Sequence, residues 1–196
     1  MWTAKRGPEN LRLEREKDPI AFADKLLFAG GQERIVGFKM LNDQARPVQE
    51  YILSRSDIKK IVVCRSNVLS VYASNRIARA TGQWIVQDCA PIRRAMVTFD
   101  PDDFAKFVSV HIAFYARMDR SIRASGSPHI RLEYEDLANS DIHETILDFL
   151  GADPTDKLST RMIKQNPGSI EERFTNWDRV VATLSGTEME GWLQGN

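Results

Sequence analysis

An arginine and two serines near the start of a predicted helix are the residues best suited to chemistry. Segment 59–64 ends in four apolar residues and is followed by Arg65, and Ser70 and Ser74 come next with a spacing of four residues. That spacing puts both hydroxyl groups on one face of a helix. A guanidinium group binds phosphate through paired N–H donors, and a hydroxyl group supplies another donor. The pattern therefore predicts an anion site suited to phosphate.

This site needs a strand that leads directly into a helix. Segment 60–64 is short and mostly apolar, which is typical of a buried strand, and Ser66 or Asn67 can cap the following helix. We expect that helix to end at about Gly82. Ligands of α/β proteins bind at the carboxyl edge of the sheet, where this strand would place Arg65. The alternative is an ion pair between Arg65 and a surface carboxylate.

Strand and helix patterns alternate along the rest of the chain. Asp18 and Pro19 are typical of a helix start, and Asp141 with Glu144 resembles a capping box. The expected helices cover residues 19–28, 47–53, 101–125 and 141–150, and the further expected strands cover residues 34–40 and 129–134. Alternation of this kind predicts an α/β fold, with a parallel sheet covered by helices on both faces.

Composition and charge limit the function classes. The chain has 196 residues, 42% of them hydrophobic, which fits a single domain over 1–196 with a polar, mobile segment at 1–17. It has 27 acidic and 27 basic residues, so it lacks the basic field that nucleic acid or an anionic membrane requires. No apolar run has the length of a signal peptide or membrane span, which predicts a cytoplasmic location.

The cysteines and histidines do not have the spacing of metal ligands. Cys64 lies in a predicted strand, and Cys89 has no close cysteine or histidine partner. His111 lies on the apolar stripe of the long helix 101–125, which favours a core residue over a catalytic base. We therefore expect two reduced thiols and no metal site.

Three segments, in order, resemble the PAPS-dependent sulfotransferases, where PAPS is 3'-phosphoadenosine 5'-phosphosulfate. The Arg65 segment resembles the region that holds the 3'-phosphate of the donor. The Tyr-Glu-Asp-Leu turn at 134–137, followed by the Phe-Leu-Gly helix end at 149–151, resembles a second signature. Residues 163–167 and 176–187 resemble the tail of the bacterial branch that includes the Nod-factor and other glycolipid sulfotransferases. The resemblance extends from about Gly37 to Leu193.

This resemblance implies a fold, a reaction and cofactor-binding residues. The fold would be a three-layer sandwich with a central parallel sheet, like that of the P-loop nucleotide hydrolases. The reaction would transfer a sulfuryl group from PAPS to a hydroxyl group of a carbohydrate, glycolipid or other small molecule. By family position, Arg65 and Ser74 would hold the 3'-phosphate, Tyr134 would contact the adenine, and Lys164 would close over the nucleotide. Ser70 is an alternative to Ser74, and no catalytic residue is assigned.

The Ser-Gly-Ser/Thr phosphosulfate loop with which these enzymes begin is not found in the sequence. The glycine pair at 30–31 follows a helical pattern and has no serine or threonine after it, which favours a helix end. The chain therefore resembles a sulfotransferase without its first βα unit. We expect such a chain to fold poorly or to fill the gap with a partner, such as a second copy.

Two other functions stay open. One is a degenerate or truncated nucleotide-binding module, which would retain the 3'-phosphate site without transferase activity. The other is a P-loop phosphotransferase, which requires a glycine-rich loop with lysine and a metal-binding carboxylate. We rank the phosphotransferase last because the sequence shows neither feature.

Overall fold

The computed structural model describes residues 9–28, 35–42, 44–87, 90–163, 165–166 and 168–195. The chain divides into two compact units. The first unit contains residues 1–62, 114–132 and 139–156, and the second contains residues 63–113, 133–138 and 157–196. The chain passes from one unit to the other within both strands and within the longest helix, so each unit is built from separate parts of the sequence.

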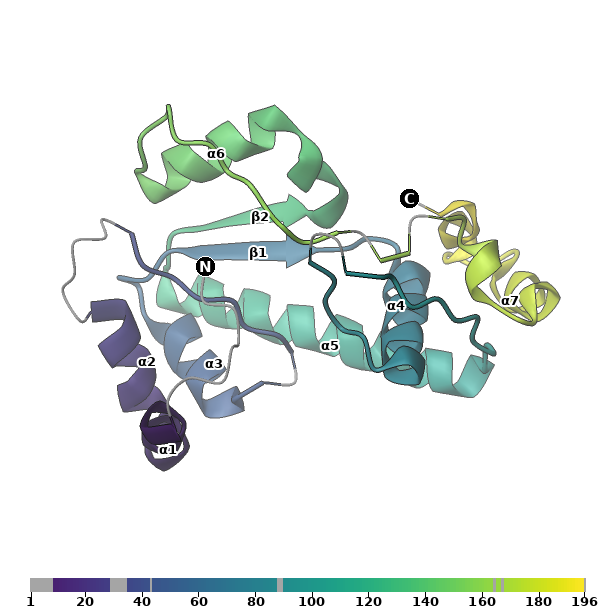
Figure 1. The fold of residues 1–196 in the computed structure, drawn as a ribbon, viewed down its shortest axis with the longest axis horizontal. Coiled ribbons are helices and arrows are strands. Elements are labelled where there is room, and N and C mark those ends of the chain that lie inside the picture. The colour runs from purple at the N-terminus through teal and green to yellow at the C-terminus, as the bar shows by residue number, and fades with distance from the viewer. Residues whose placement is uncertain are drawn as a thin grey trace. The chain divides into compact units, whose positions relative to one another are not determined.

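Seven helices and two strands make up most of the described residues (Figure 1). The helices are α1 (Glu9–Lys17), α2 (Pro19–Phe28), α3 (Arg46–Ser54), α4 (Val68–Thr81), α5 (Pro101–Ser125), α6 (Ser140–Leu150) and α7 (Trp177–Leu184). The strands are β1 (Lys60–Cys64) and β2 (His129–Glu133). Three short 3-10 helices are η1 (Tyr134–Ala138), η2 (Glu171–Arg173) and η3 (Glu190–Gln194).

The sheet of the described residues consists of β1 and β2, which lie side by side and run in the same direction (Figure 1). The amide of Lys60 donates to the carbonyl oxygen of Pro128 at the start of the pair, 3.0 Å away. The α/β prediction is therefore confirmed at the level of mixed helices and a small parallel sheet.

The strand predicted over 34–40 is wrong for its described part. Residues 35–40 have no regular secondary structure, and Ile35, Val36 and Phe38 are exposed. A strand needs a neighbour to satisfy its backbone groups, and no described strand pairs with this segment. Apolar alternation alone did not determine the structure here.

The polar segment before Asp18 also differs from the expectation. Residues 9–17 form α1, whereas we expected a mobile segment over 1–17, of which 1–8 lie outside the described residues. Arg12 pairs with Glu16 one turn later at 3.0 Å, and Lys25 of α2 reaches Glu14 at 2.6 Å. Ion pairs of this kind support a helix whose sequence has few apolar residues.

The cap of α6 also differs from the prediction. The Oδ1 atom of Asn139 accepts the amide of Asp141 at 3.0 Å, so Asn139 is the N-cap, two residues before the start of the capping box that we predicted from Asp141 and Glu144. The end of α6 is as predicted, because Gly151 has a φ of 74°, which glycine adopts without strain.

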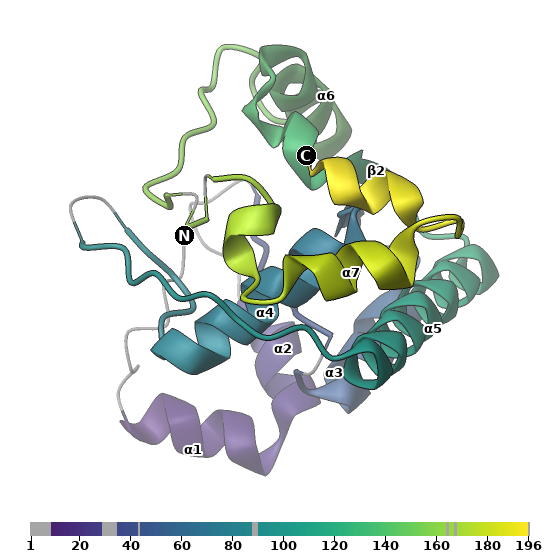
Figure 2. The ribbon, with the colours of Figure 1, turned by 90° about the vertical axis from the view of Figure 1, so that its right-hand side faces the viewer.

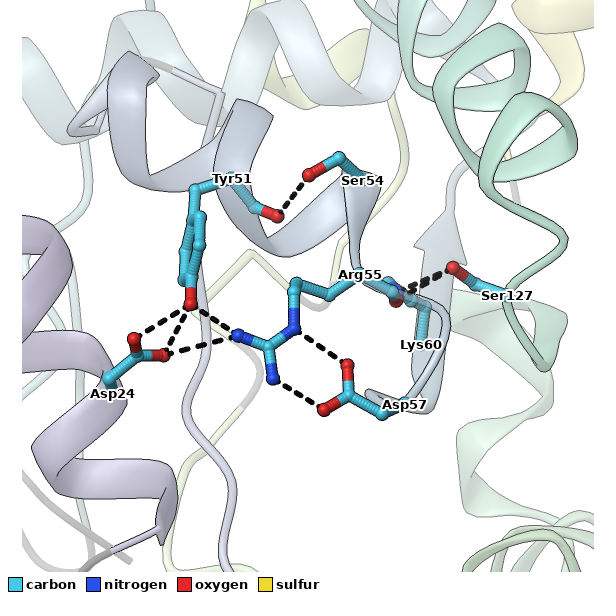
Figure 3. A network of polar contacts seen from close by, with 7 residues as sticks. All are labelled: Asp24, Tyr51, Ser54, Arg55, Asp57, Lys60 and Ser127. Atoms are coloured by element: carbon cyan, nitrogen blue, oxygen red, sulfur yellow. Dashed lines mark hydrogen bonds and ion pairs between the residues drawn. The ribbon is translucent and has the colours of Figure 1, made fainter.

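A polar network connects α2, α3 and the start of β1 in the first unit (Figure 3). The hydroxyl of Tyr51 donates to Asp24 at 2.7 Å and receives a hydrogen bond from Arg55, whose Nη2 also lies 2.5 Å from Asp57. Hydrogen bonding to Asp24 raises the pKa of Tyr51. The network therefore holds the turn that precedes β1.

Lys60 is the one buried lysine in the described part of the chain. Its Nζ donates to Ser127 at 2.7 Å and to the carbonyl oxygen of Arg55 (Figure 3). Burial lowers the pKa of Lys60, while the charge of Asp57 raises it and that of Arg55 lowers it. Because its ammonium group is buried and donates to two oxygens of the protein, we assign Lys60 a structural role.

The second unit has an aromatic core. Its centre consists of Tyr72, Phe99, Phe104 and Phe174, which contact one another at centroid distances of 5.2–6.4 Å. Aliphatic side chains complete the core: Leu69, Ala73, Ile170, Val180 and Leu184. The C-terminal turn η3 packs beside α7, as Figure 2 shows.

We predict that Asp103 contributes to the acid sensitivity of this core. Burial raises the pKa of Asp103. Hydrogen bonds from Tyr72 and Arg76 lower it by a larger amount in total, so the net pKa is below the usual value. A lowered carboxyl pKa stabilises the folded state above the unfolded-state pKa of about 3.9, and this contribution is lost as the pH falls through the folded-state pKa. Urea unfolding between pH 5 and 2 should therefore show a smaller loss of stability for Asp103→Asn than for the native chain. Equal pH dependence of the two proteins would contradict this prediction.

Candidate anion site

The predicted strand and helix around Arg65 are both present. Strand β1 ends at Cys64, which is buried as expected for a strand residue, and α4 begins three residues after Arg65 at Val68. Asn67 is the N-cap, with extended backbone, and its Oδ1 accepts the amide of Ser70 at 2.9 Å. Its Nδ2 donates to the carbonyl oxygen of Trp192 at 2.9 Å, which ties the helix start to η3.

Arg65 lies against Tyr134. The guanidinium carbon is 3.5 Å from the centroid of the tyrosine ring. Arg65 directly follows β1 and Tyr134 directly follows β2, so two neighbouring parallel strands deliver them to the same edge of the sheet. A guanidinium that stacks on a ring keeps its N–H donors in its own plane, where an anion can accept them.

Glu133 contributes the negative charge of this edge. Its Oε2 accepts the amide of Ser66 at 3.1 Å, just before the start of α4. The carboxylate thereby occupies one backbone donor that an anion could otherwise use. The alternative role of Arg65 was a surface ion pair. Among the described residues, no carboxylate lies within 4.0 Å of the Arg65 guanidinium, so this alternative has no support.

The two candidate serines differ in burial and position. Ser70 is 5% exposed and lies in the first turn of α4, whereas Ser74 is half-buried and lies one turn further along the helix. From the first helical residue, Val68, the helix rises by about 9 Å to Ser74. Accessibility favours Ser74, and proximity to Arg65 favours Ser70. The structure describes no hydrogen bond between Arg65 and either serine.

Lys164 lies outside the described residues, so its position is not part of the site described here. The neighbouring motif residues of the C-terminal segment have structural roles. Asn176 bonds both the amide and the carbonyl of Phe99, at 2.8 and 3.0 Å, and Thr187 donates to the carbonyl oxygen of Leu184 at 2.6 Å. These contacts hold α7 in the second unit.

Arg173 is a half-buried arginine that sequence patterns did not single out. It lies at the end of η2, and its Nη2 donates to the carbonyl oxygens of Asn166 and Gly168, both at 3.0 Å. Burial lowers its pKa, and the nearby positive charge of Arg65 lowers it further, while Glu172 raises it.

The Nε atom of Arg173 is buried and has no hydrogen-bond partner. A buried unsatisfied donor costs about 1–3 kcal/mol, more when it is charged. Backbone contacts fix the residue in place, because Val97 donates to the carbonyl oxygen of Arg173 at 2.9 Å and accepts the amide of Thr175 at 3.0 Å. The tertiary structure therefore keeps this unsatisfied donor buried.

The Arg65 guanidinium offers N–H donors of the kind that phosphate and carboxylate groups accept. Among the described residues, no group of three histidine, cysteine or acidic side chains could hold a metal ion. No described helix has both the length and the apolar sequence that crossing a membrane requires.

No protein-family model, curated protein or solved structure matches the chain.

Proposed function

We propose that the chain binds a 3'-phosphorylated adenosine nucleotide and acts as a PAPS-dependent sulfotransferase. One observation carries this proposal: Arg65 follows β1, precedes α4 and stacks on Tyr134, which follows β2. Two of the four residues expected from the resemblance to that family are thus in contact. Under this function Arg65 binds the 3'-phosphate, Ser74 or Ser70 adds a hydroxyl donor, and Lys164 closes over the nucleotide.

Tyr134 has a defined part in this assignment. Arg65 covers one face of its ring, so adenine would contact the other face or the ring edge. The stack also fixes the guanidinium before the ligand arrives, which reduces the entropy lost on binding. Stacking and phosphate binding are compatible because they use the face and the edge of the guanidinium, respectively.

The proposed reaction moves a sulfuryl group in line from PAPS to a hydroxyl group of a carbohydrate or glycolipid. A bond forms between the acceptor oxygen and sulfur as the bond from sulfur to the bridging phosphate oxygen breaks. A general base takes the acceptor proton, and adenosine 3',5'-bisphosphate leaves with the electron pair. Positive groups must neutralise the charge that grows on the bridging oxygen. We assign no residue to these two roles.

The same proposal includes a three-layer sandwich in which β1 and β2 are neighbouring strands of a central parallel sheet. It also includes a cytoplasmic location and a homo-oligomer, whose mass light scattering would measure. The second candidate function is a nucleotide-binding module without transferase activity. The missing Ser-Gly-Ser/Thr loop in the sequence favours this alternative.

Binding and turnover should be measured separately. Calorimetry with adenosine 3',5'-bisphosphate and with ADP should detect tighter binding of the 3'-phosphorylated nucleotide. Incubation with PAPS and a panel of sugars and glycolipids should then release adenosine 3',5'-bisphosphate for a sulfotransferase. Selective binding without release would identify the binding module, and equal affinity for the two nucleotides would rule out both functions.

A further inference from the structure

We propose that residues 83–87, 90–94 and 161–163 form a surface that binds the anionic face of a lipid bilayer, and we call it the Trp84 surface. All three segments belong to the second unit. The large apolar side chains that are exposed on it are Trp84, Ile85, Met162 and Ile163. The surface uses none of the residues of the candidate anion site, so the proposal is independent of the function proposed above.

Backbone contacts bring the apolar segments of this surface together. Gln87 and Met162 form an antiparallel bridge, and the amide of Ile163 donates to the carbonyl oxygen of Val86 at 3.0 Å. Val86 is 2% exposed and anchors the pair, whereas the adjacent Ile85 is 62% exposed. The exposed side chains therefore belong to neighbouring stretches of backbone, although more than 70 positions separate them in the sequence.

Side-chain hydrogen bonds hold the backbone on which Trp84 lies. Gln83 donates from Nε2 to the carbonyl oxygen of Pro91 at 3.0 Å and accepts the amide of Arg93 at 2.8 Å. The guanidinium of Arg93 donates to the carbonyl oxygen of Thr81 at 3.0 Å. Trp84 follows Gln83 directly, so these contacts fix its backbone before a partner binds. A side chain on a fixed backbone loses less entropy on binding.

The exposed apolar side chains favour a partner that removes them from water. Apolar side chains that gather on an exposed surface mark sites of contact with membranes or proteins. Tryptophan has a particular preference for the bilayer interface, because its ring is apolar and its indole N–H donates to polar groups at the headgroup level. Trp84 is 59% exposed, which leaves most of its ring available for such a contact.

Local charge selects an anionic partner. Segments 81–99 and 157–170 contain five basic residues and one acidic residue, although the whole chain has equal numbers of both. Arg93, Arg94 and Arg161 belong to the Trp84 surface and are exposed. Each basic residue near an anionic bilayer strengthens binding by about fivefold. The balanced total charge thus excludes an overall basic field but leaves this local excess.

The aliphatic side chains favour a bilayer over other anionic partners. Nucleic acid can stack on a tryptophan and pair with arginines, but it offers no apolar phase for Ile85 or Met162. A bilayer interface accepts the indole ring, the aliphatic chains and the guanidinium groups at the same time. The composition of the Trp84 surface therefore fits anionic lipid best.

Carboxylates set a boundary to this surface. Met96 is also exposed, but it lines a pocket together with Glu171, Glu172 and Asp178. Anionic headgroups would repel these carboxylates, so we exclude Met96 from the Trp84 surface. Lipid binding should therefore slow amide exchange at 83–87 and 161–163, but not at the acidic segment 171–178.

Vesicle binding of the full chain tests the proposal. Vesicles of equimolar phosphatidylglycerol and phosphatidylcholine are compared with vesicles of phosphatidylcholine alone, and sedimentation measures the bound protein. Trp84→Ala should weaken binding to the anionic vesicles at least tenfold, and Arg94→Gln should weaken it about fivefold. Added salt should weaken binding of the native protein.

Two control variants separate this surface from exposed residues elsewhere. Ile112→Ala removes an apolar side chain of the same unit that is 60% exposed, and Arg120→Gln removes an exposed arginine of the first unit. Both should bind the anionic vesicles like the native protein. A thermal melt of each variant without lipid shows that it is folded.

Four results would overturn the inference. The first is equal affinity of the native protein for the two kinds of vesicle, or binding to neither. The second is unchanged binding of Trp84→Ala, which would leave charge alone as the cause. The third is a homodimer that light scattering detects without lipid and that Trp84→Ala dissociates, because a second copy would then occupy the surface. The fourth is Trp84-dependent binding of polyuridylate without vesicle binding, which would identify a nucleic-acid surface.

Discussion

Replacing Phe174 with alanine should lower the free energy of unfolding by about 3–5 kcal/mol. Phe174 is 2% exposed and lies at the centre of the second unit, stacked between Tyr72 at 6.4 Å and Trp177 at 6.2 Å. Its ring also meets the edge of Phe99 at 5.9 Å. Removing it takes away these contacts and leaves a cavity that a packed core fills only in part.

Urea unfolding followed by far-ultraviolet circular dichroism would measure this effect. Trp84→Ala is the matched control, because Trp84 is an aromatic residue of the same unit that is 59% exposed. We expect the control to change stability by less than 1 kcal/mol, in the range typical of surface substitutions. A loss below 1 kcal/mol for Phe174→Ala would mean that the aromatic cluster does not stabilise the fold.

The pairing of Phe174 with Val97 also determines the position of its neighbour, Arg173. The bridge between Val97 and Phe174 and the hydrogen bonds on either side of it fix the backbone of Arg173. The core thus fixes the backbone that carries the Arg173 side chain.

Local sequence signals predicted the elements that carry Arg65. The apolar run before it is β1, Asn67 is the helix cap, and α4 ends before Gly82, which has a φ of 68°. Long helices with strong apolar periodicity, such as α5, were predicted to within a residue. These elements are determined by residues close together in the sequence, and so they can be inferred without the tertiary structure.

Features that depend on distant residues were not predicted. Residues 35–40 have the composition of a strand but lack a described neighbour, and α1 is polar but is supported by ion pairs. Arg173 follows two glutamates in the sequence, which is typical of a surface ion pair. Its half-buried position depends on the pairing of residues 173–175 with Val97, which no local sequence pattern indicates.

The motifs that resemble the sulfotransferase family also give limited information about function. The Tyr-Glu-Asp-Leu turn forms η1, and the Phe-Leu-Gly sequence ends α6 at Gly151. Both therefore have local structural roles that any strand–turn–helix connection would need. Among the predicted site residues, the contact between Arg65 and Tyr134 is the feature that local structure does not require. A functional test should consequently be directed at this contact.

Arg65→Ala should weaken the binding of adenosine 3',5'-bisphosphate by about one to two orders of magnitude. A hydrogen bond to a charged group contributes about 1.5–3 kcal/mol, and each 1.4 kcal/mol corresponds to a factor of ten. The stability of the unliganded protein should fall by about 0.5–2 kcal/mol, because Arg65 and Tyr134 are half-buried and a cation–π contact contributes about 0.5–1 kcal/mol when exposed and about 2 kcal/mol when desolvated. Calorimetric titration gives the affinity, and a thermal melt without ligand gives the stability.

Two variants identify which property of Arg65 matters. Arg65→Lys keeps the charge but has neither the planar fork nor the broad stacking surface, so its affinity should lie between those of the native and alanine proteins. Arg120→Ala removes an exposed arginine of the first unit and should bind like the native protein. If Arg65→Ala binds the bisphosphate as tightly as the native chain but melts earlier, the stack on Tyr134 is purely structural. A loss of affinity without a loss of stability would instead make the Arg65 guanidinium a ligand-binding group, held in place by the tyrosine before the phosphate arrives.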